Sequence, residues 1–217
     1  MTITQQKEVI VDDFMVNDDT TSGGDSPVMA QDRFGNFVIV WEDYRNLDSL
    51  GRDIYAQRYN SFGDTLGSNF RVNDDTGGAF QECPCDVATD GLGRFLVIFE
   101  DHRPPQSRDH AQWYDSDGNP IGSNFPLNYN SDTALVDTRA VVGMDSSGKY
   151  VLTWTDGRNS PWPNSDIYAQ RYEYPHAPIG SNFKVNDDLG NAYQDDASIA
   201  MNRSGDFVIT WEDGRLG

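Results

Sequence analysis

The stretch Phe37-Val-Ile-Val-Trp-Glu-Asp-Tyr-Arg45, followed by Asp53-Ile-Tyr-Ala-Gln-Arg-Tyr59, is the template for most of this chain. The first part returns as Phe99-Glu-Asp-His-Arg103, Trp154-Thr-Asp-Gly-Arg158 and Trp211-Glu-Asp-Gly-Arg215, at spacings of 58, 55 and 57 residues. A further segment, Gly67-Ser-Asn-Phe-Arg-Val-Asn-Asp-Asp75, returns at 122–130 and 180–188. Self-similarity at a fixed period predicts a repeat protein, in which each copy is one supersecondary unit.

Each copy reads as four antiparallel strands. An inner strand with a column of small residues (27–32, 85–90, 140–145, 197–202) is joined by an Asp/Asn-x-x-Gly hairpin turn to a second strand. The second strand alternates Phe37, Ile39 and Trp41 on one face with Val38 and Val40 on the other, so both of its faces must be covered. The third and fourth strands, at 54–59 and 69–73, are progressively more polar. This gradient is typical of a β-propeller blade packed between neighbours.

The sequence therefore predicts an all-β, single-domain, four-bladed β-propeller with four antiparallel strands in each blade. The blades are expected at 27–76, 84–131, 139–189 and 196–217. The last blade holds only two strands, and Phe14-Met-Val-Asn-Asp-Asp19 matches Phe70 to Asp75, so residues 1–19 are expected to complete it. Pairing the two ends in this way would remove two exposed sheet edges.

The composition of the chain limits the kinds of partner that it is expected to bind. A formal net charge of −19 repels phosphate, so nucleic acid and anionic membrane surfaces are not expected as partners. No window approaches the ~18 apolar residues that span a bilayer, and Met1-Thr-Ile-Thr-Gln-Gln-Lys7 lacks the apolar core of a signal peptide. A chain of 217 residues buries a sizeable core as one domain. We expect a monomer rather than a homodimer.

The pattern Gly-x-Phe-Val-x-x-Trp-x-Asp, then Ile-Tyr-Ala-Gln-Arg-Tyr, then Gly-x-x-Phe-x-Val-Asn resembles propeller-type repeats of large secreted or surface proteins of bacteria. The resemblance covers nearly the whole chain. It implies an extracellular or cell-surface location and a part in binding or display, and it implies no single activity.

Antiparallel topology places the loops after the second and fourth strands at one end of the ring, called here the acidic loop face. Its first motif contributes Asp43, Asp101, Asp156 and Asp213, each with an Arg two residues later. The structural interpretation is that each Asp caps its turn and pairs with an Arg. The alternative is that Arg45, Arg103, Arg158 and Arg215 form a carboxylate-binding cluster.

The second motif of the acidic loop face is Asn-Asp-Asp. Its structural interpretation is a turn in which Asn and Asp bind local backbone donors. The alternative is a calcium site, because calcium collects carboxylate and carbonyl oxygens. The metal ligands would come from Asp18, Asp19, Asp74, Asp75, Asp187 and Asp188. No other cofactor is expected.

Function in repeat folds often lies where the copies differ. The loop Asn159-Ser-Pro-Trp-Pro-Asn-Ser165 holds Trp162 between two prolines, either as a contact for a sugar or protein or as a lid packed on its own blade. Tyr44, His102 and Arg103 stand in the corresponding loops of the first two copies and complete the predicted binding residues.

Three functions remain open at this point. The first is a non-catalytic propeller that binds carbohydrate or protein. The second is an enzyme of the glycoside-hydrolase or lyase type, which would need two unpaired carboxylates about 5–10 Å apart. The third is a scaffold without a ligand, or a part of a larger propeller array. No nucleophile triad or phosphate loop occurs in the sequence, so we expect binding rather than catalysis.

Overall fold

The computed structural model describes residues 13–47, 51–74, 81–102, 108–127, 139–158, 164–188 and 192–216. Its strands form antiparallel sheets in chain order. The first sheet holds β1 (Gly24–Gln31), β2 (Phe37–Asp43), β3 (Asp53–Tyr59) and β4 (Thr65–Arg71). The second holds β5 (Gln81–Thr89), β6 (Phe95–Asp101), β7 (Arg108–Tyr114) and β8 (Pro120–Pro126). The third holds β9 (Val141–Met144), β10 (Tyr150–Asp156), β11 (Asp166–Glu173) and β12 (Ala177–Lys184).

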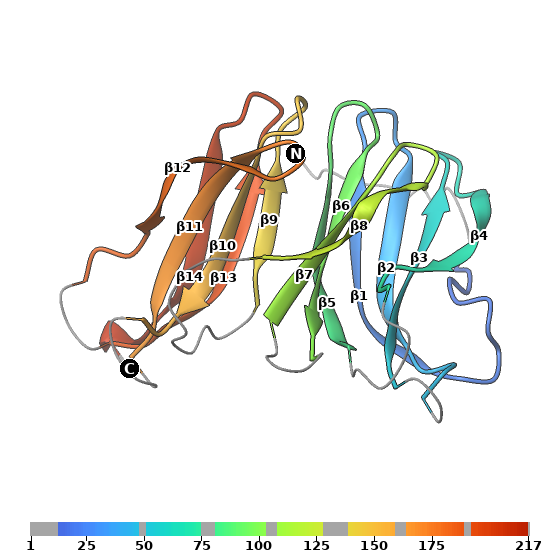
Figure 1. The fold of residues 1–217 in the computed structure, drawn as a ribbon, viewed down its shortest axis with the longest axis horizontal. Coiled ribbons are helices and arrows are strands. Elements are labelled where there is room, and N and C mark those ends of the chain that lie inside the picture. The colour runs from blue at the N-terminus through green and yellow to red at the C-terminus, as the bar shows by residue number, and fades with distance from the viewer. Residues whose placement is uncertain are drawn as a thin grey trace, which may run out of the picture.

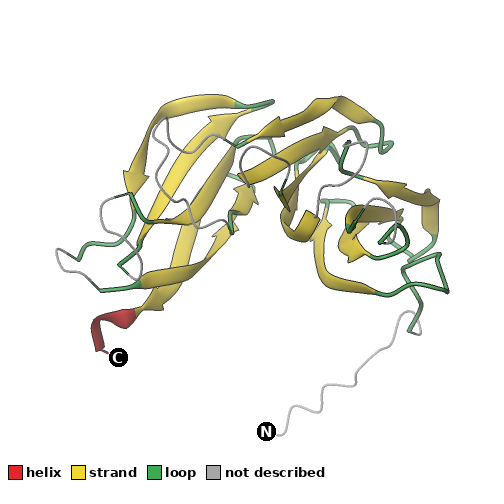
Figure 2. Ribbon diagram, turned by 60° about the horizontal axis from the view of Figure 1, so that its bottom comes forward, coloured by secondary structure: helices red, strands yellow, loops and turns green. Residues whose placement is uncertain are grey.

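The fourth sheet pairs β13 (Gln194–Met201) with β14 (Phe207–Asp213), and the 3-10 turn η1 (Gly214–Leu216) follows. Within the described ranges this sheet has two strands. The sheets stand side by side like the blades of a propeller along an arc, with β1–β4 on one side of the molecule and the sheets β9–β12 and β13–β14 on the other (Figures 1 and 2). The inner strands β1, β5, β9 and β13 contact one another in that order. The predicted all-β propeller fold is confirmed.

The hydrophobic core lies between neighbouring blades. Strand β6 has two apolar faces because each face packs against a different blade. Phe95, Val97 and Phe99 pack against the first blade, in a cluster with Val38 and Val40. The alternate residues Leu96 and Ile98 pack against the third blade, in a cluster with Trp154 and Leu152. Because alternate side chains of a strand point to opposite faces, one strand supplies both cores.

Inner strands begin earlier than the sequence predicts: β1 at Gly24, β5 at Gln81 and β13 at Gln194. The pairing continues across irregularities between Asp25 and Val28 and between Asp195 and Ser198. A β-bulge adds a residue to one strand without ending the ladder, so the break in alternation hid these strand ends.

The described N-terminal residues contact the fourth strand of the first blade. The Nδ2 group of Asn69 on β4 donates to the carbonyl of Val16, and the backbone amide of Asp18 donates to Asn69 Oδ1 at 2.9 Å. Asn124 on β8 holds Val72 and Asp74 of the preceding blade in the same way. Residues 14–19 therefore behave as the end of a blade that precedes the first, as the repeat alignment predicts.

Closure of the last blade is not seen in the described residues. Residues 13–23 form no strand with β14, because the contacts with Asn69 hold them against the first sheet. Residues 1–12, from which the missing third strand was expected, lie outside the described part. No helix in that part is long and apolar enough to cross a membrane.

Candidate functional site

The Asp of the Trp-x-Asp-x-Arg motif serves its own blade. Asp43 is fully buried, and its Oδ1 accepts the backbone amide of Arg45 at 2.9 Å and the guanidinium Nε at 2.8 Å. Its Oδ2 accepts the indole N–H of Trp41 at 2.9 Å. Burial raises the pKa of Asp43, but the hydrogen bonds from Arg45 and Trp41 outweigh it, and the pKa lies below its ordinary value. The same donors hold Asp156, and Arg215 holds Asp213. The structural interpretation of this motif is confirmed for Asp43, Asp156 and Asp213, while the arginine that follows Asp101 lies outside the described residues.

The described arginines of the motif also bind other groups of the protein. Arg45 lies 4.0 Å over the ring of Tyr55, donates to Asn17 at 2.9 Å and pairs with Asp18 at 3.0 Å. Its hydrogen bond with Asp43 raises its pKa further. Arg158 lies in the same way over Tyr168. Guanidinium groups bound on these sides leave few donors for a ligand carboxylate, so the described structure does not favour an arginine cluster.

Two of the predicted binding residues lie in the described part and keep to their own loops. Tyr44 follows β2, its amide donates to Gly23, and Arg52 lies 5.4 Å from its ring. Burial raises the pKa of the Tyr44 hydroxyl, and Glu42 adds to the rise. The Nε2 atom of His102 lies 3.4 Å from Glu100. Trp162 and Arg103 lie outside the described residues.

The predicted calcium ligands are spread along the arc and hold other partners. Asp19 accepts hydrogen bonds from Ser22 and Thr21, which lower its pKa to about 2. Asp187 pairs with Arg215 at 2.9 Å, and Asp74 accepts the amide of Asn124 at 3.1 Å. Asp75 lies outside the described residues.

In the third blade, Lys184 pairs with the carboxylates that a metal cation would need. The ammonium group of Lys184 lies 2.7 Å from Asp166 and 3.7 Å from Asp188, a residue that is 7% exposed. Within the described ranges, no three His, Cys, Asp or Glu side chains gather as a ligand group. Calcium binding therefore stays a prediction without support from these contacts.

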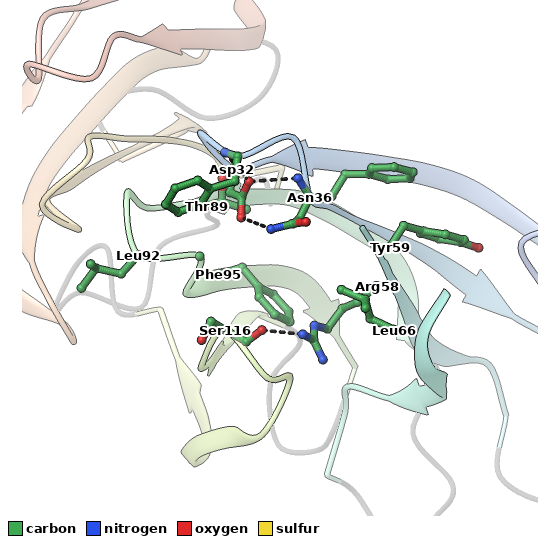
Figure 3. Close-up of a pocket in the computed structure, with 12 residues that line it drawn as sticks. Asp32, Asn36, Arg58, Tyr59, Leu66, Thr89, Leu92, Phe95 and Ser116 are labelled. Carbon is green, nitrogen blue, oxygen red and sulfur yellow. Dashed lines mark hydrogen bonds between the residues drawn. The ribbon is translucent and has the colours of Figure 1, made fainter. Parts of the chain in front are cut away.

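A groove lies at the opposite end of the blades, where the hairpin turns of the first two blades meet (Figure 3). Its volume is about 220 Å³. Phe37 and Tyr59 stack at 4.8 Å along its first-blade side, and Phe95 lies on its second-blade side. Phe34 and Leu92, which are 61% and 64% exposed, also line it. Pockets for whole small ligands occupy ~300–1,000 Å³, so this groove suits one unit of a longer ligand.

Polar groups also line the groove and join its two blades. Asp32 accepts the amide of Phe34 at 2.7 Å and the side-chain amide of Asn36 at 2.9 Å. Arg58 reaches from β3 across to the second blade and donates to the carbonyl of Ser116, as Figure 3 shows, and to that of Asp117. Gly118 makes room for it, because a Cβ there would lie 2.9 Å from the Arg58 side chain. The groove therefore has a polar frame, held by these hydrogen bonds, beside its apolar side chains.

Sequence reasoning missed this groove, although a signal was present. The third position of the Asp/Asn-x-x-Gly turn is Phe34 in the first copy and Leu92 in the second, and it is Ser147 and Ser204 in the other two. An apolar residue at an exposed turn position, in two adjacent copies alone, marks a local departure from the repeat. The sequence shows this departure, but only the packing of neighbouring blades shows that the two side chains line one groove.

The comparisons with known proteins support the fold. No family model matches the chain, and no curated protein matches it. A protein of unknown function from Dyadobacter fermentans is similar in structure, with a TM-score of 0.59, 12% identity and coverage of 92% of this chain and 64% of that one. An endo-arabinase from Bacteroides thetaiotaomicron is also similar in structure, with a TM-score of 0.53 at 13% identity. The match covers 94% of this chain and 76% of that one.

A third similar structure is the α-L-arabinofuranosidase of Podospora anserina in complex with cellotriose. Its TM-score is 0.50 at 10% identity, with coverage of 89% of this chain and 61% of that one. This chain thus spans about two thirds of the length of the solved structures it resembles. At such identities the likeness shows the fold alone, and that fold is the β-propeller.

Proposed function

We propose that this protein is a non-catalytic β-propeller module that binds a neutral oligosaccharide in the groove between its first two blades. The observation that carries the proposal is the pairing of exposed apolar side chains, Phe34 and Leu92, with the polar frame of Asp32, Asn36 and Arg58. A sugar ring offers an apolar C–H face for an aromatic side chain and hydroxyl groups for polar ones. The net charge of −19 favours a neutral ligand over an acidic one.

The state of the carboxylates supports binding over catalysis. Glycoside hydrolysis uses two carboxyl groups that flank one glycosidic bond. On the described acidic loop face, Asp43, Asp156 and Asp213 are each bound by an arginine of their own motif. These donors lower the pKa of Asp43 and Asp213, so both carboxylates stay ionised and have little capacity left for proton transfer to a substrate.

A glycoside hydrolase is the second candidate, and one observation favours it. Asp86 on the inner strand β5 has a pKa raised by burial, as a general acid requires. Its carboxylate, however, accepts the amides of Val87 and of Val142 in the next blade at 2.8 and 2.9 Å. These contacts make Asp86 a link between two blades. Two of the similar solved structures are named as an arabinase and an arabinofuranosidase, so arabinan is the substrate to test.

The first experiment is titration of the protein by calorimetry with cellotriose and with arabino-oligosaccharides. Phe34→Ala should weaken binding about tenfold, equal to roughly 1.4 kcal/mol, because it removes the exposed ring from the groove. Phe62→Ala is the matched control, since Phe62 is 76% exposed in a turn of the same blade and does not line the groove. It should change the affinity less than twofold. Neither variant should change the Tm.

Three results would overturn the proposal. Equal effects of the two variants would mean that the groove is not the site. Loss of binding in Trp162→Ala, with none in Phe34→Ala, would move the site to the acidic loop face. Release of reducing sugar from arabinan, abolished by Asp86→Asn, would establish the enzyme instead.

A further inference from the structure

The packing of the second blade against the third repeats the packing of the first against the second. We call these contacts the second junction and the first junction, and the groove lies at the first. At the first junction, a Cβ added to the turn glycine Gly93 would lie 3.3 Å from the Cβ of Ser116. At the second, a Cβ added to Gly148 would lie 3.6 Å from the Cβ of Tyr174. Ser116 and Tyr174 therefore hold the same position in the two junctions.

A second pair of contacts supports this correspondence. Arg58 of β3 donates to the backbone carbonyl of Asp117 in the second blade. Trp113 stands at the same position of β7 and donates to the backbone carbonyl of Pro175 in the third blade at 2.6 Å. The two carbonyls belong to the residues that come directly after the serine and the tyrosine compared above. At each junction, therefore, one side chain reaches from the preceding blade to the same point of the next turn.

At the second junction, the ring of Tyr174 fills the space that forms the groove at the first. The guanidinium carbon of Arg94 lies 4.0 Å from the centroid of this ring, and the Trp113 ring lies 5.0 Å from it at an interplanar angle of 79°. These two neighbours correspond in the repeat to Asn36 and Arg58, which line the groove. The protein thus holds a flat six-membered ring at one junction and leaves the same place open at the other.

The open groove offers two polar groups to a ligand. Asn36 donates through Nδ2 to Asp32 at 2.9 Å, and its Oδ1 atom makes no hydrogen bond to any residue that the structure describes. The hydroxyl of Ser116 makes none within the described ranges either. Figure 3 shows these two side chains on opposite sides of the groove. A ring that carries hydroxyl groups fits this lining better than a hydrocarbon ring, because its hydroxyls supply partners for both groups.

We propose that the groove binds one pyranose unit of its ligand, as a flat six-membered ring in the place that Tyr174 takes at the second junction. Ser116 determines this specificity, because its small side chain leaves the space open and its hydroxyl is available to the sugar. A furanose ring has five members and would fill less of the same space, with fewer contacts. The inference rests on the proposed function and names the class of sugar that the groove takes.

The first test compares two sugars by calorimetry with the original protein. Cellotriose is built of pyranose units, and an arabino-oligosaccharide of the same length is built of furanose units. Cellotriose should bind about tenfold more tightly, because its ring fills the space. Equal affinities would overturn the inference and leave the proposed function standing. No binding of either sugar at millimolar concentration would overturn both.

Two tyrosine substitutions at one position of the repeat locate the ring. Ser116→Tyr should fill the groove as Tyr174 fills the second junction, and should weaken cellotriose binding by about tenfold or more. Ser61→Tyr is the matched control, because Ser61 holds this position in the first blade, is exposed and does not line the groove. Its affinity for cellotriose should stay within about twofold of the original value. Equal binding by the two variants would overturn the inference.

The converse substitution should open the second junction. Tyr174→Ser removes the ring from its place beside Arg94 and Trp113, and should create a second cellotriose site in each chain. Near-UV circular dichroism checks that this variant keeps the packing of its other aromatic rings. A folded Tyr174→Ser protein without the additional site would overturn the correspondence of the junctions. Full cellotriose binding by Ser116→Tyr, when Phe34→Ala weakens it, would keep the sugar in the groove and refute the position of its ring.

Discussion

Substitution of Arg158 by alanine tests whether the Asp–Arg pairs hold the blades together. The Arg158 side chain is 16% exposed and its partner Asp156 is fully buried. Arg158 donates through Nε at 2.8 Å and also through Nη2 to Asp156, and its Nη1 donates to Asn182 on β12 at 3.1 Å. Its guanidinium also lies 4.0 Å from the Tyr168 ring centroid. One side chain thus joins β10, β11 and β12.

The expected cost follows from what the substitution leaves behind. Asp156 would keep the indole N–H of Trp154 and the backbone amide of residue 158, so the buried carboxylate would lose its counter-ion but not every donor. Removing one partner of a buried pair costs ~3–5 kcal/mol, and the remaining donors place Arg158→Ala near the lower end. For a domain of this size each kcal/mol lowers the Tm by ~2–4 °C. The Tm should therefore fall by about 6–12 °C.

The fourth blade supplies a matched control. Arg215 makes the same contact with Asp213, but the two side chains are 45% and 27% exposed. Solvent screens this pair, so Arg215→Ala should change the Tm by less than ~2 °C. Scanning calorimetry of both variants measures the difference. The argument from burial is refuted if the Tm of Arg158→Ala lies within 2 °C of that of the original protein, or if both substitutions lower the Tm equally.

Two further predictions concern a turn and the response to acid. Gly118→Ala and Gly67→Ala both place a side chain at a positive φ, of 82° and 80°, at a cost of roughly 1–2 kcal/mol each. A Cβ at Gly118 also collides with Arg58 whereas one at Gly67 meets nothing within 4 Å, so Gly118→Ala should have the lower Tm, and equal values would contradict the contact. The pKa of Asp43 is lowered on folding, so its pairing with Arg45 stabilises the protein above the ordinary value of 3.8 and is lost as the pH falls below it. Melting curves at pH 6, 4 and 3 should show this fall, with a smaller fall in Asp43→Asn.

Much of the local structure could be predicted because it depends on residues near one another in the chain. The turn Asp32-Arg-Phe-Gly35 forms a hairpin because the Asp32 carboxylate accepts the backbone amides of Phe34 and Asn36, and Gly35 adopts a φ of 87°. Asp43 and Arg45 pair because they are two residues apart at the end of one strand. Such contacts recur in each copy, and the repeat makes them visible.

Contacts between blades could not be predicted in the same way. The groove depends on Phe34 and Leu92, which are 58 positions apart, and on the reach of Arg58 into a turn of the next blade. The rotation between the two sheets brings these side chains together, and no single segment of the sequence determines that rotation. For the same reason the alignment of residues 14–19 with the end of a blade did not show that Asn69 of the first blade would bind Val16 and Asp18.

By itself the sequence determined the strands, their order and the polar contacts that close each blade, because alternation and short-range hydrogen bonds are properties of one segment. The tertiary structure alone decided which of the described carboxylates bind arginine and where exposed side chains gather. These features depend on the packing of one blade against the next, in which small rotations between sheets place side chains from distant segments together or leave them apart.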